Sequence, residues 1–159
     1  MSLADALARS GGIARTADLA ADGFGRRAIE RAIARGDLVR VKRGWVAEPA
    51  TDPHLVAAVR CGVVLTCITQ ARRLGLWVLE HDRPHVAARP HSGRAPTATT
   101  RVHWGAPVVP RHPQVHVDPI ENVLVEVSRC QPRETALALW NSALNTGLAD
   151  LASLRRLPL

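Results

Sequence analysis

The apolar and polar positions of residues 25–45 follow first a helical and then an extended pattern. Over residues 26–35, apolar side chains recur with a period of about 3.6 residues and share one helix face, while the other face is almost entirely charged. The members of the apolar face are Ala28, Ile29, Ala32 and Ile33. Gly36 can adopt a positive φ and end the helix. Two short β-prone runs within residues 38–47 then flank a basic tip, so the pattern predicts a helix followed directly by a tight hairpin.

The preceding residues complete a small helical unit. Apolar spacing predicts a first helix over residues 3–8 and a second over residues 17–21, with Thr16 as the N-cap of the second. Gly25 stands at the N-cap of the third helix, where Ser or Asp would be a better cap. Three helices and a two-stranded wing predict a winged helix-turn-helix DNA-binding domain over residues 1–48.

A change of composition after residue 48 predicts a second domain over residues 54–159. The Pro-containing segment 48–53 is typical of a linker. The pattern beyond it predicts helices over 54–60, 66–74, 121–128, 134–146 and 151–157, and extended segments over 85–88, 100–104 and 115–117. We expect a small α/β domain whose sheet is covered by helices, so the predicted fold class of the chain is α+β.

The chain has a formal net charge of +7, and positive charge is densest in the predicted helix and hairpin. Residues 25–45 contain seven basic residues against two acidic ones; the basic ones are Arg26, Arg27, Arg31, Arg35, Arg40, Lys42 and Arg43. Phosphates attract such a surface and a major groove accommodates such a helix, so these seven residues are the predicted contacts to double-stranded DNA. Arg27 and Arg31 lie near the middle of the polar face and are expected to reach base edges. Glu30 is expected to pair with a neighbouring arginine of the helix.

The cysteines and the apolar stretches predict a cytoplasmic protein without membrane contact. Cys61, Cys67 and Cys130 show no CxxC spacing and stand in apolar or helical surroundings, so we expect buried, reduced, inert thiols. The N-terminus lacks the apolar core of a secretory signal. The longest apolar stretch, around residues 63–65, is far too short to span a bilayer.

The seven histidines do not predict a metal site. His112 and His116 are separated by the spacing of one helical turn, but nearby prolines argue against a helix, and His116 is expected to point out of a strand. His81, His85 and His91 have no carboxylate or thiolate at ligand spacing. We therefore expect no metal site and no cofactor.

Catalytic motifs are not found in the sequence either. Asp118 and Glu121 are close together, but Pro119 separates them and no lysine follows Lys42, as a nuclease site would usually require. Glu121 and Glu126 resemble a solvated helix face, and there is no phosphate loop, HExxH motif or serine elbow. We therefore predict no catalytic residues and no enzymatic activity. Three tryptophans are expected to be core or interface anchors, namely Trp77, Trp104 and Trp140.

The string GGIARTADLAADGFGRRAIERAIARGDLVRVKRGWVAEP resembles the N-terminal winged-helix domain of AbiEi-type antitoxins. These antitoxins belong to type IV toxin–antitoxin (abortive infection) systems. The Gly-Gly-Ile start, the helix pair, the Arg-rich helix and the Lys-Arg-Gly-Trp wing occur in the same order. The strings ITQARRLGLW, RVHW, PIENVLVEVSRC and WNSALNTGL resemble actinobacterial proteins that begin with a related domain. In several of those proteins a very-short-patch-repair-like endonuclease domain follows at about the point where this chain ends.

The resemblance implies a transcriptional regulator of the antitoxin type, which represses its own operon and neutralises a partner toxin. It assigns Arg26, Arg27, Arg31 and Arg35 to the recognition helix, and Arg40, Lys42 and Arg43 to the wing. Gly25 departs from the family, which usually has Ser there, and this weakens the cap. The alternative is the non-catalytic DNA-binding front part of an endonuclease whose C-terminal nuclease domain is absent from this chain. A third class is a protein–protein module in which the winged helix serves only as a scaffold.

Overall fold

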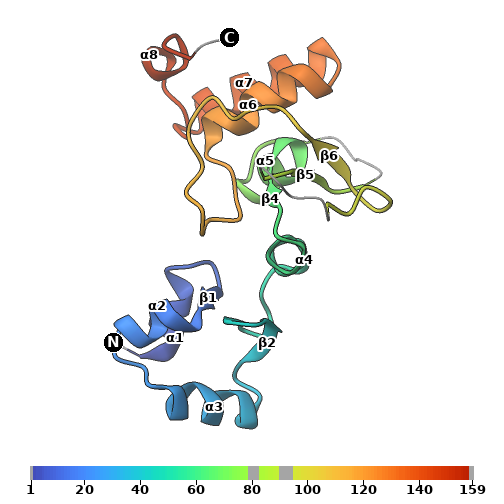
Figure 1. The fold of residues 1–159 in the computed structure, drawn as a ribbon. Coiled ribbons are helices and arrows are strands. Elements are labelled where there is room, and N and C mark those ends of the chain that lie inside the picture. Colours follow the sequence, from blue (N-terminus) through green and yellow to red (C-terminus); the bar gives the residue numbers. More distant parts are fainter. Residues whose placement is uncertain (1, 79–82, 90–94, 158–159) are drawn as a thin grey trace. The chain divides into compact units, whose positions relative to one another are not determined.

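The protein is a mixed α+β structure that divides into two compact units, Met1–Arg60 and Cys61–Leu159 (Figure 1). It is described by a computed structural model that covers residues 2–78, 83–89 and 95–157. The units divide at Arg60, whereas the sequence placed the domain border in the linker before residue 54. The assignment of residues 1–48 and 54–159 as separate domains stays a prediction.

Unit 1 combines four helices with a three-stranded antiparallel sheet in the order β1-β3-β2. Its elements are α1 (Leu3–Ala8), β1 (Ile13–Arg15), α2 (Thr16–Ala21), α3 (Arg26–Arg35), β2 (Val39–Lys42), β3 (Trp45–Ala47) and α4 (Pro53–Cys61). The three helices before the hairpin and both hairpin strands were predicted. The first strand was not, because a three-residue run between two helices carries no readable alternation.

Packing of one face of α3 forms the centre of unit 1. Ile29 and Ala32 are buried in the core of this unit, and Ile33 and Phe24 pack against its edge. Gly36 ends the helix in the left-handed conformation with φ +82°, as predicted. The core therefore fixes which side of α3 faces solvent.

Thr16 is the first residue of α2 and not its N-cap, which corrects the prediction. Arg15 occupies the N-cap position without a side-chain hydrogen bond. The Thr16 amide donates to the Gly44 carbonyl (2.9 Å), and the hydroxyl lies 3.5 Å from the same oxygen. Thr16 therefore ties the start of α2 to the hairpin tip, a long-range contact that local capping rules cannot anticipate.

Unit 2 contains a three-stranded sheet in the order β4-β5-β6, with β4 antiparallel and β6 parallel to β5. Its elements are β4 (Val64–Leu65), α5 (Cys67–Arg73), β5 (His85–Ala87), β6 (Arg101–His103), α6 (Ile120–Cys130), α7 (Arg133–Asn145) and α8 (Leu151–Leu154). The predicted strand over residues 115–117 is wrong, because only Val117 bridges Leu65. The Arg89 guanidinium instead holds this segment by donating to the Val115 and His112 carbonyls.

The core of unit 2 lies between α5, α6 and α7. Its buried members include Ile68, Ala71, Val123, Leu124, Val127, Leu139 and Ala143. Trp140 packs at its edge and donates from its indole to the Ser128 hydroxyl (2.9 Å). Trp77 and Trp104 are instead 63% and 65% exposed, so of the two predicted roles, core or interface anchor, only the interface role remains for these residues. Among the helices of the described residues, none is long and apolar enough to cross a membrane.

The two glycines that flank α3 provide a matched test of how this helix ends. A Cβ added at Gly25 or at Gly36 meets no atom within 4 Å, but only Gly36 has a positive φ. We therefore expect Gly36→Ala to destabilise α3 by about 1–2 kcal/mol, and Gly25→Ala, which only weakens the N-cap, to destabilise it less. Hydrogen exchange of the α3 amides in the full chain measures both. Equal effects of the two substitutions would show that the left-handed cap does not determine the helix end.

Candidate nucleic-acid interface

The polar face of α3 is exposed, and its first turn contains an ion pair. Arg26 Nε lies 2.8 Å from Glu30 Oε1, and the Arg26 side chain is 89% exposed, which confirms the predicted pairing of Glu30 with a neighbouring arginine. The hydrogen bond from Arg26 and its charge hold the pKa of Glu30 below its ordinary value of 4.5, and Arg40 lowers that pKa further. The same bond raises the pKa of Arg26. The negative charge of Glu30 is therefore balanced by the positive charge of Arg26.

The other arginines of α3 differ in what they contact. Arg27 and Arg31 are exposed, and their guanidinium groups make no ion pair with any residue that the structure describes. Arg35, in the last turn, pairs with Asp37 (2.7 Å). Arg27 and Arg31 therefore keep their donors available on adjacent turns of one helix face.

The first half of α3 and strand β2 share one surface. An open groove of about 350 Å³ lies between α2, α3 and β2. Its polar lining residues are Thr16, Arg26, Glu30 and Arg40. The groove thus lies between the predicted recognition helix and the hairpin. Thr16, which was predicted only as a helix cap, is one of its lining residues.

Lys42 differs from the six arginines of the predicted set. Its ammonium donates to the Val59 carbonyl of α4 and lies 5.8 Å from the centroid of the Trp45 ring. The side chain is half-buried, whereas Arg40 and Arg43 are exposed. A β-bulge between Arg40 and Lys42 shifts the register against β3, and this irregularity breaks the side-chain alternation that the sequence suggests.

Residues 1–49 match the model of the family described as "Transcriptional regulator, AbiEi antitoxin". No curated protein matches the sequence. The match confirms the predicted AbiEi-type resemblance, and the matched segment extends from α1 through the β2–β3 hairpin. All seven predicted DNA contacts lie within the AbiEi-type segment.

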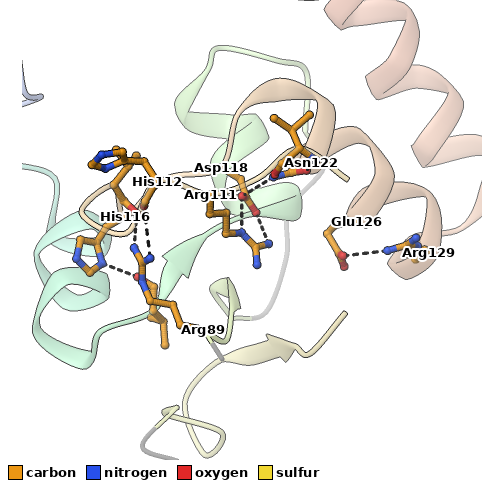
Figure 2. Close-up of polar contacts among 11 residues, drawn as sticks. Arg89, Arg111, His112, His116, Asp118, Asn122, Glu126 and Arg129 are labelled. Atoms are coloured by element: carbon orange, nitrogen blue, oxygen red, sulfur yellow. Dashed lines mark hydrogen bonds and ion pairs between the residues drawn. The ribbon is translucent and has the colours of Figure 1, made fainter. Parts of the chain in front are cut away.

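Unit 2, beyond the AbiEi-type segment, contains a buried polar network around Asp118. Figure 2 shows Arg111 reaching the Asp118 carboxylate, with Arg111 Nε and Nη2 at 2.7 and 2.8 Å from its two oxygens. Asn122 Nδ2 donates to the same carboxylate (3.0 Å) and to the Val109 carbonyl (2.9 Å). The network fastens the loop before α6 to that helix. Both oxygens of Asp118 are thus used in folding, which disfavours the nuclease interpretation weighed for Asp118 and Glu121.

Two other polar residues of unit 2 are buried, against expectation. Glu126 was predicted on a solvated helix face, but its side chain is 6% exposed and contacts His103 and Arg129. His116 was predicted to point out of a strand, but it is buried, with Nδ1 2.7 Å from the Val63 carbonyl. Sequence periodicity missed both because His103, which contacts Glu126, and Val63, which contacts His116, lie far away in the chain.

Cys67 is not an activated nucleophile. Burial raises the pKa of the Cys67 thiol, and the neighbouring Cys130 raises it further. A nucleophilic cysteine requires the opposite shift. Cys61 and Cys130 are half-buried, so the expectation of buried thiols is confirmed fully only for Cys67.

The Arg26–Glu30 pair predicts a measurable titration difference. Because Arg26 lowers the folded-state pKa of Glu30, the pair stabilises the fold above the ordinary carboxyl pKa and this contribution is lost as the pH falls through the lowered value. Arg26→Gln should therefore raise the Glu30 pKa, measured by NMR titration of its carboxyl carbon. Arg31→Gln removes the same charge one residue away without removing a hydrogen bond, and should raise that pKa less. An equal shift in both variants would contradict the specific pairing.

Proposed function

We propose that this protein is a DNA-binding transcriptional regulator of the AbiEi antitoxin type. In this proposal residues 1–48 are a winged helix-turn-helix, α3 is its recognition helix and the β2–β3 hairpin is its wing. The observation that carries the proposal is the coincidence of the family match with a row of exposed arginines on α3 and the hairpin. The protein would repress its own operon and neutralise a partner toxin.

The dimensions and chemistry of α3 support binding in the major groove. A helix of ten residues is about 15 Å long, and the major groove is about 12 Å wide. Arg27 and Arg31 carry the donors suited to the guanine O6 and N7 atoms. Their lack of ion-pair partners among the described residues means that binding would break no existing pair there.

The hairpin is expected to contact phosphates through Arg40 and Arg43. Both are exposed, and Arg40 lines the groove shared with α3. Lys42 contributes less in this proposal than in the sequence prediction, because its ammonium already donates to the Val59 carbonyl. Its expected role is to fasten the hairpin to α4.

Unit 2 is proposed to bind a protein partner without catalysing a reaction. Trp77 and Trp104 are 63% and 65% exposed, and large exposed aromatic side chains are common anchors of protein interfaces. The Trp77 amide donates to the Ser142 hydroxyl (3.4 Å), so the backbone beneath this side chain is fixed against α7. A partner that buries this side chain would therefore not have to order the backbone beneath it.

DNA binding by the full chain should weaken steeply with salt. If about four arginines meet phosphates, log K should fall with log salt at a slope of about −4. Arg43→Gln should weaken cognate and random duplexes alike and reduce the slope by about 1, whereas Arg27→Ala or Arg31→Ala should cost about 1–3 kcal/mol on the operator and reduce specificity. Fluorescence anisotropy across a salt titration measures these effects.

A matched control for this experiment is Arg9→Gln. Arg9 pairs with Asp22 outside α3 and the hairpin, and its loss changes the net charge by the same amount. It should leave the affinity nearly unchanged. Binding that is independent of salt, or an Arg9→Gln effect as large as that of Arg43→Gln, would remove the DNA-binding proposal.

If unit 2 binds a partner toxin, this protein should form a complex with the protein that the neighbouring gene of its operon encodes. Trp77→Ala or Trp104→Ala should weaken that complex by at least about 2 kcal/mol if the residue is a central anchor. Val39→Ala, which trims an exposed apolar side chain of unit 1, is the control and should have no effect. Isothermal titration calorimetry with the purified neighbour provides the measurement, and a neighbour that does not bind would contradict toxin neutralisation.

A further inference from the structure

Four potential metal ligands that are distant in sequence meet in unit 2. They are Cys67 at the first residue of α5, His85 at the first residue of β5, His103 at the last residue of β6 and Cys130 at the last residue of α6. One ligand atom from each lies within 4.8 Å of every other. No two of them stand at CxxC or HxxxH spacing, so the cluster exists only in the folded unit.

The backbone brings Cys67, His85 and His103 together without involving their ligand atoms. The Thr66 amide donates to the His85 carbonyl (3.3 Å), and the His85 amide donates to the Thr69 hydroxyl (2.7 Å). These bonds hold the start of β5 against the start of α5. The parallel pairing of β5 with β6 then places His85 and His103 two residues apart along neighbouring strands. The scaffold is therefore already organised around the cluster.

The distances between ligand atoms fit a tetrahedral ion. His103 Nε2 lies 3.3 Å from His85 Nδ1, and Cys130 Sγ lies 3.6 Å from the same nitrogen. A tetrahedral Zn²⁺ with metal–nitrogen distances of about 2.0–2.1 Å and metal–sulfur distances of about 2.3 Å separates two nitrogens by about 3.3 Å, and a nitrogen from a sulfur by about 3.6 Å. These two separations match the edges of such a tetrahedron, and all four ligand atoms lie within 4.8 Å of one another.

A carboxylate behind His103 orients its ring for coordination. His103 Nδ1 lies 2.8 Å from Glu126 Oε2, and Arg129 contacts the other oxygen of Glu126 (3.4 Å; Figure 2). Because an ionised carboxylate only accepts hydrogen bonds, Nδ1 of His103 carries a proton, and Nε2 is the ring atom that faces the cluster. Histidines that bind metals commonly have such a carboxylate partner. Gln131 Nε2 also donates to Cys130 Sγ (3.2 Å), as suits a thiolate ligand.

Cys67 adopts a strained, left-handed backbone conformation at its place in the cluster. Cys67 is the only residue other than glycine with a positive φ (+51°) among the described residues. The left-handed conformation costs about 1–2 kcal/mol for an L-residue and persists where surrounding interactions impose it. Two thiolates would also balance the charge of a divalent ion, so the buried site would carry no net charge.

We propose that Cys67, His85, His103 and Cys130 bind one Zn²⁺ in a closed, structural site that joins α5, β5, β6 and α6. The site is structural because the protein supplies all four ligands and leaves no position for water or substrate. It replaces the sequence expectation that the thiols are inert and that no metal ligands converge. The proposal is independent of DNA binding by unit 1. Glu126 is a positioning residue that acts through His103.

Elemental analysis of the full chain, purified under reducing conditions without chelators, tests this proposal directly. We expect one zinc per chain. Replacement by Co²⁺ should give the intense visible bands of a tetrahedral ion together with thiolate-to-cobalt charge transfer. This spectrum reports on the wild-type ligands, so it does not depend on the folding of any variant.

Matched variants locate the site. Cys67→Ser combined with His103→Asn should abolish stoichiometric zinc and the cobalt spectrum. Cys61→Ser and His112→Asn replace a cysteine and a histidine outside the cluster and should retain both. Glu126→Gln should bind zinc about 10- to 100-fold more weakly, measured by competition with a chromophoric chelator.

Three results would overturn the proposal. The first is a reduced wild-type chain that contains no zinc and takes up neither Zn²⁺ nor Co²⁺. The second is zinc that remains stoichiometric in the Cys67→Ser/His103→Asn variant. The third is a purified wild-type chain in which Cys67 and Cys130 form a disulfide and no metal is bound after reduction.

Discussion

Side-chain contacts must hold unit 2 together, because its sheet is too small to do so through backbone hydrogen bonds. β4 has two residues and β5 and β6 have three each, which is shorter than the usual strand. The apolar core between α5, α6 and α7 provides most of the stabilising contacts. Buried polar groups attach loop segments that lie outside this core. The bidentate pair of Arg111 with Asp118 fixes the loop before α6, and loss of either partner would leave a buried charge uncompensated. The proposed metal site would lie where α5, β5, β6 and α6 meet. A bound metal would cross-link these elements, which the few backbone hydrogen bonds of such short strands hold only weakly.

In unit 1 the corresponding constraint is the one-sided burial of α3. Ile29 and Ala32 enter the core, so the arginines of the opposite face must point to solvent. The arginines at the two ends of the helix form ion pairs, Arg26 with Glu30 and Arg35 with Asp37. The arginines between them make no ion pair with any described residue. The same burial that stabilises this unit therefore presents the surface that we propose binds DNA. Lys42, which follows an irregularity in the register of β2 and β3, donates to the Val59 carbonyl of α4.

Local patterns predicted much of unit 1. The extent of α3 and its end at Gly36 followed from helical periodicity and from the need for a residue with positive φ, and both were confirmed. The pairing of Glu30 with an arginine of the same helix was also predicted, and the structure identifies that arginine as Arg26. Such features depend on interactions between residues that are close together in the chain, so they can be predicted from the sequence. The boundaries of the longer helices of unit 2 were close to those predicted for the same reason.

The sequence by itself thus determined the helices, the hairpin, the basic character of α3 and the AbiEi-type resemblance of the first 49 residues. Only the tertiary structure decided that Thr16 contacts the hairpin tip, that Glu126 and His116 are buried, and that cysteine and histidine ligands converge in unit 2. The physical reason is the range of the interactions. Periodicity and capping encode contacts within one or two turns of chain, whereas a buried ion pair or a set of metal ligands joins positions that come together only when the helices and strands have packed.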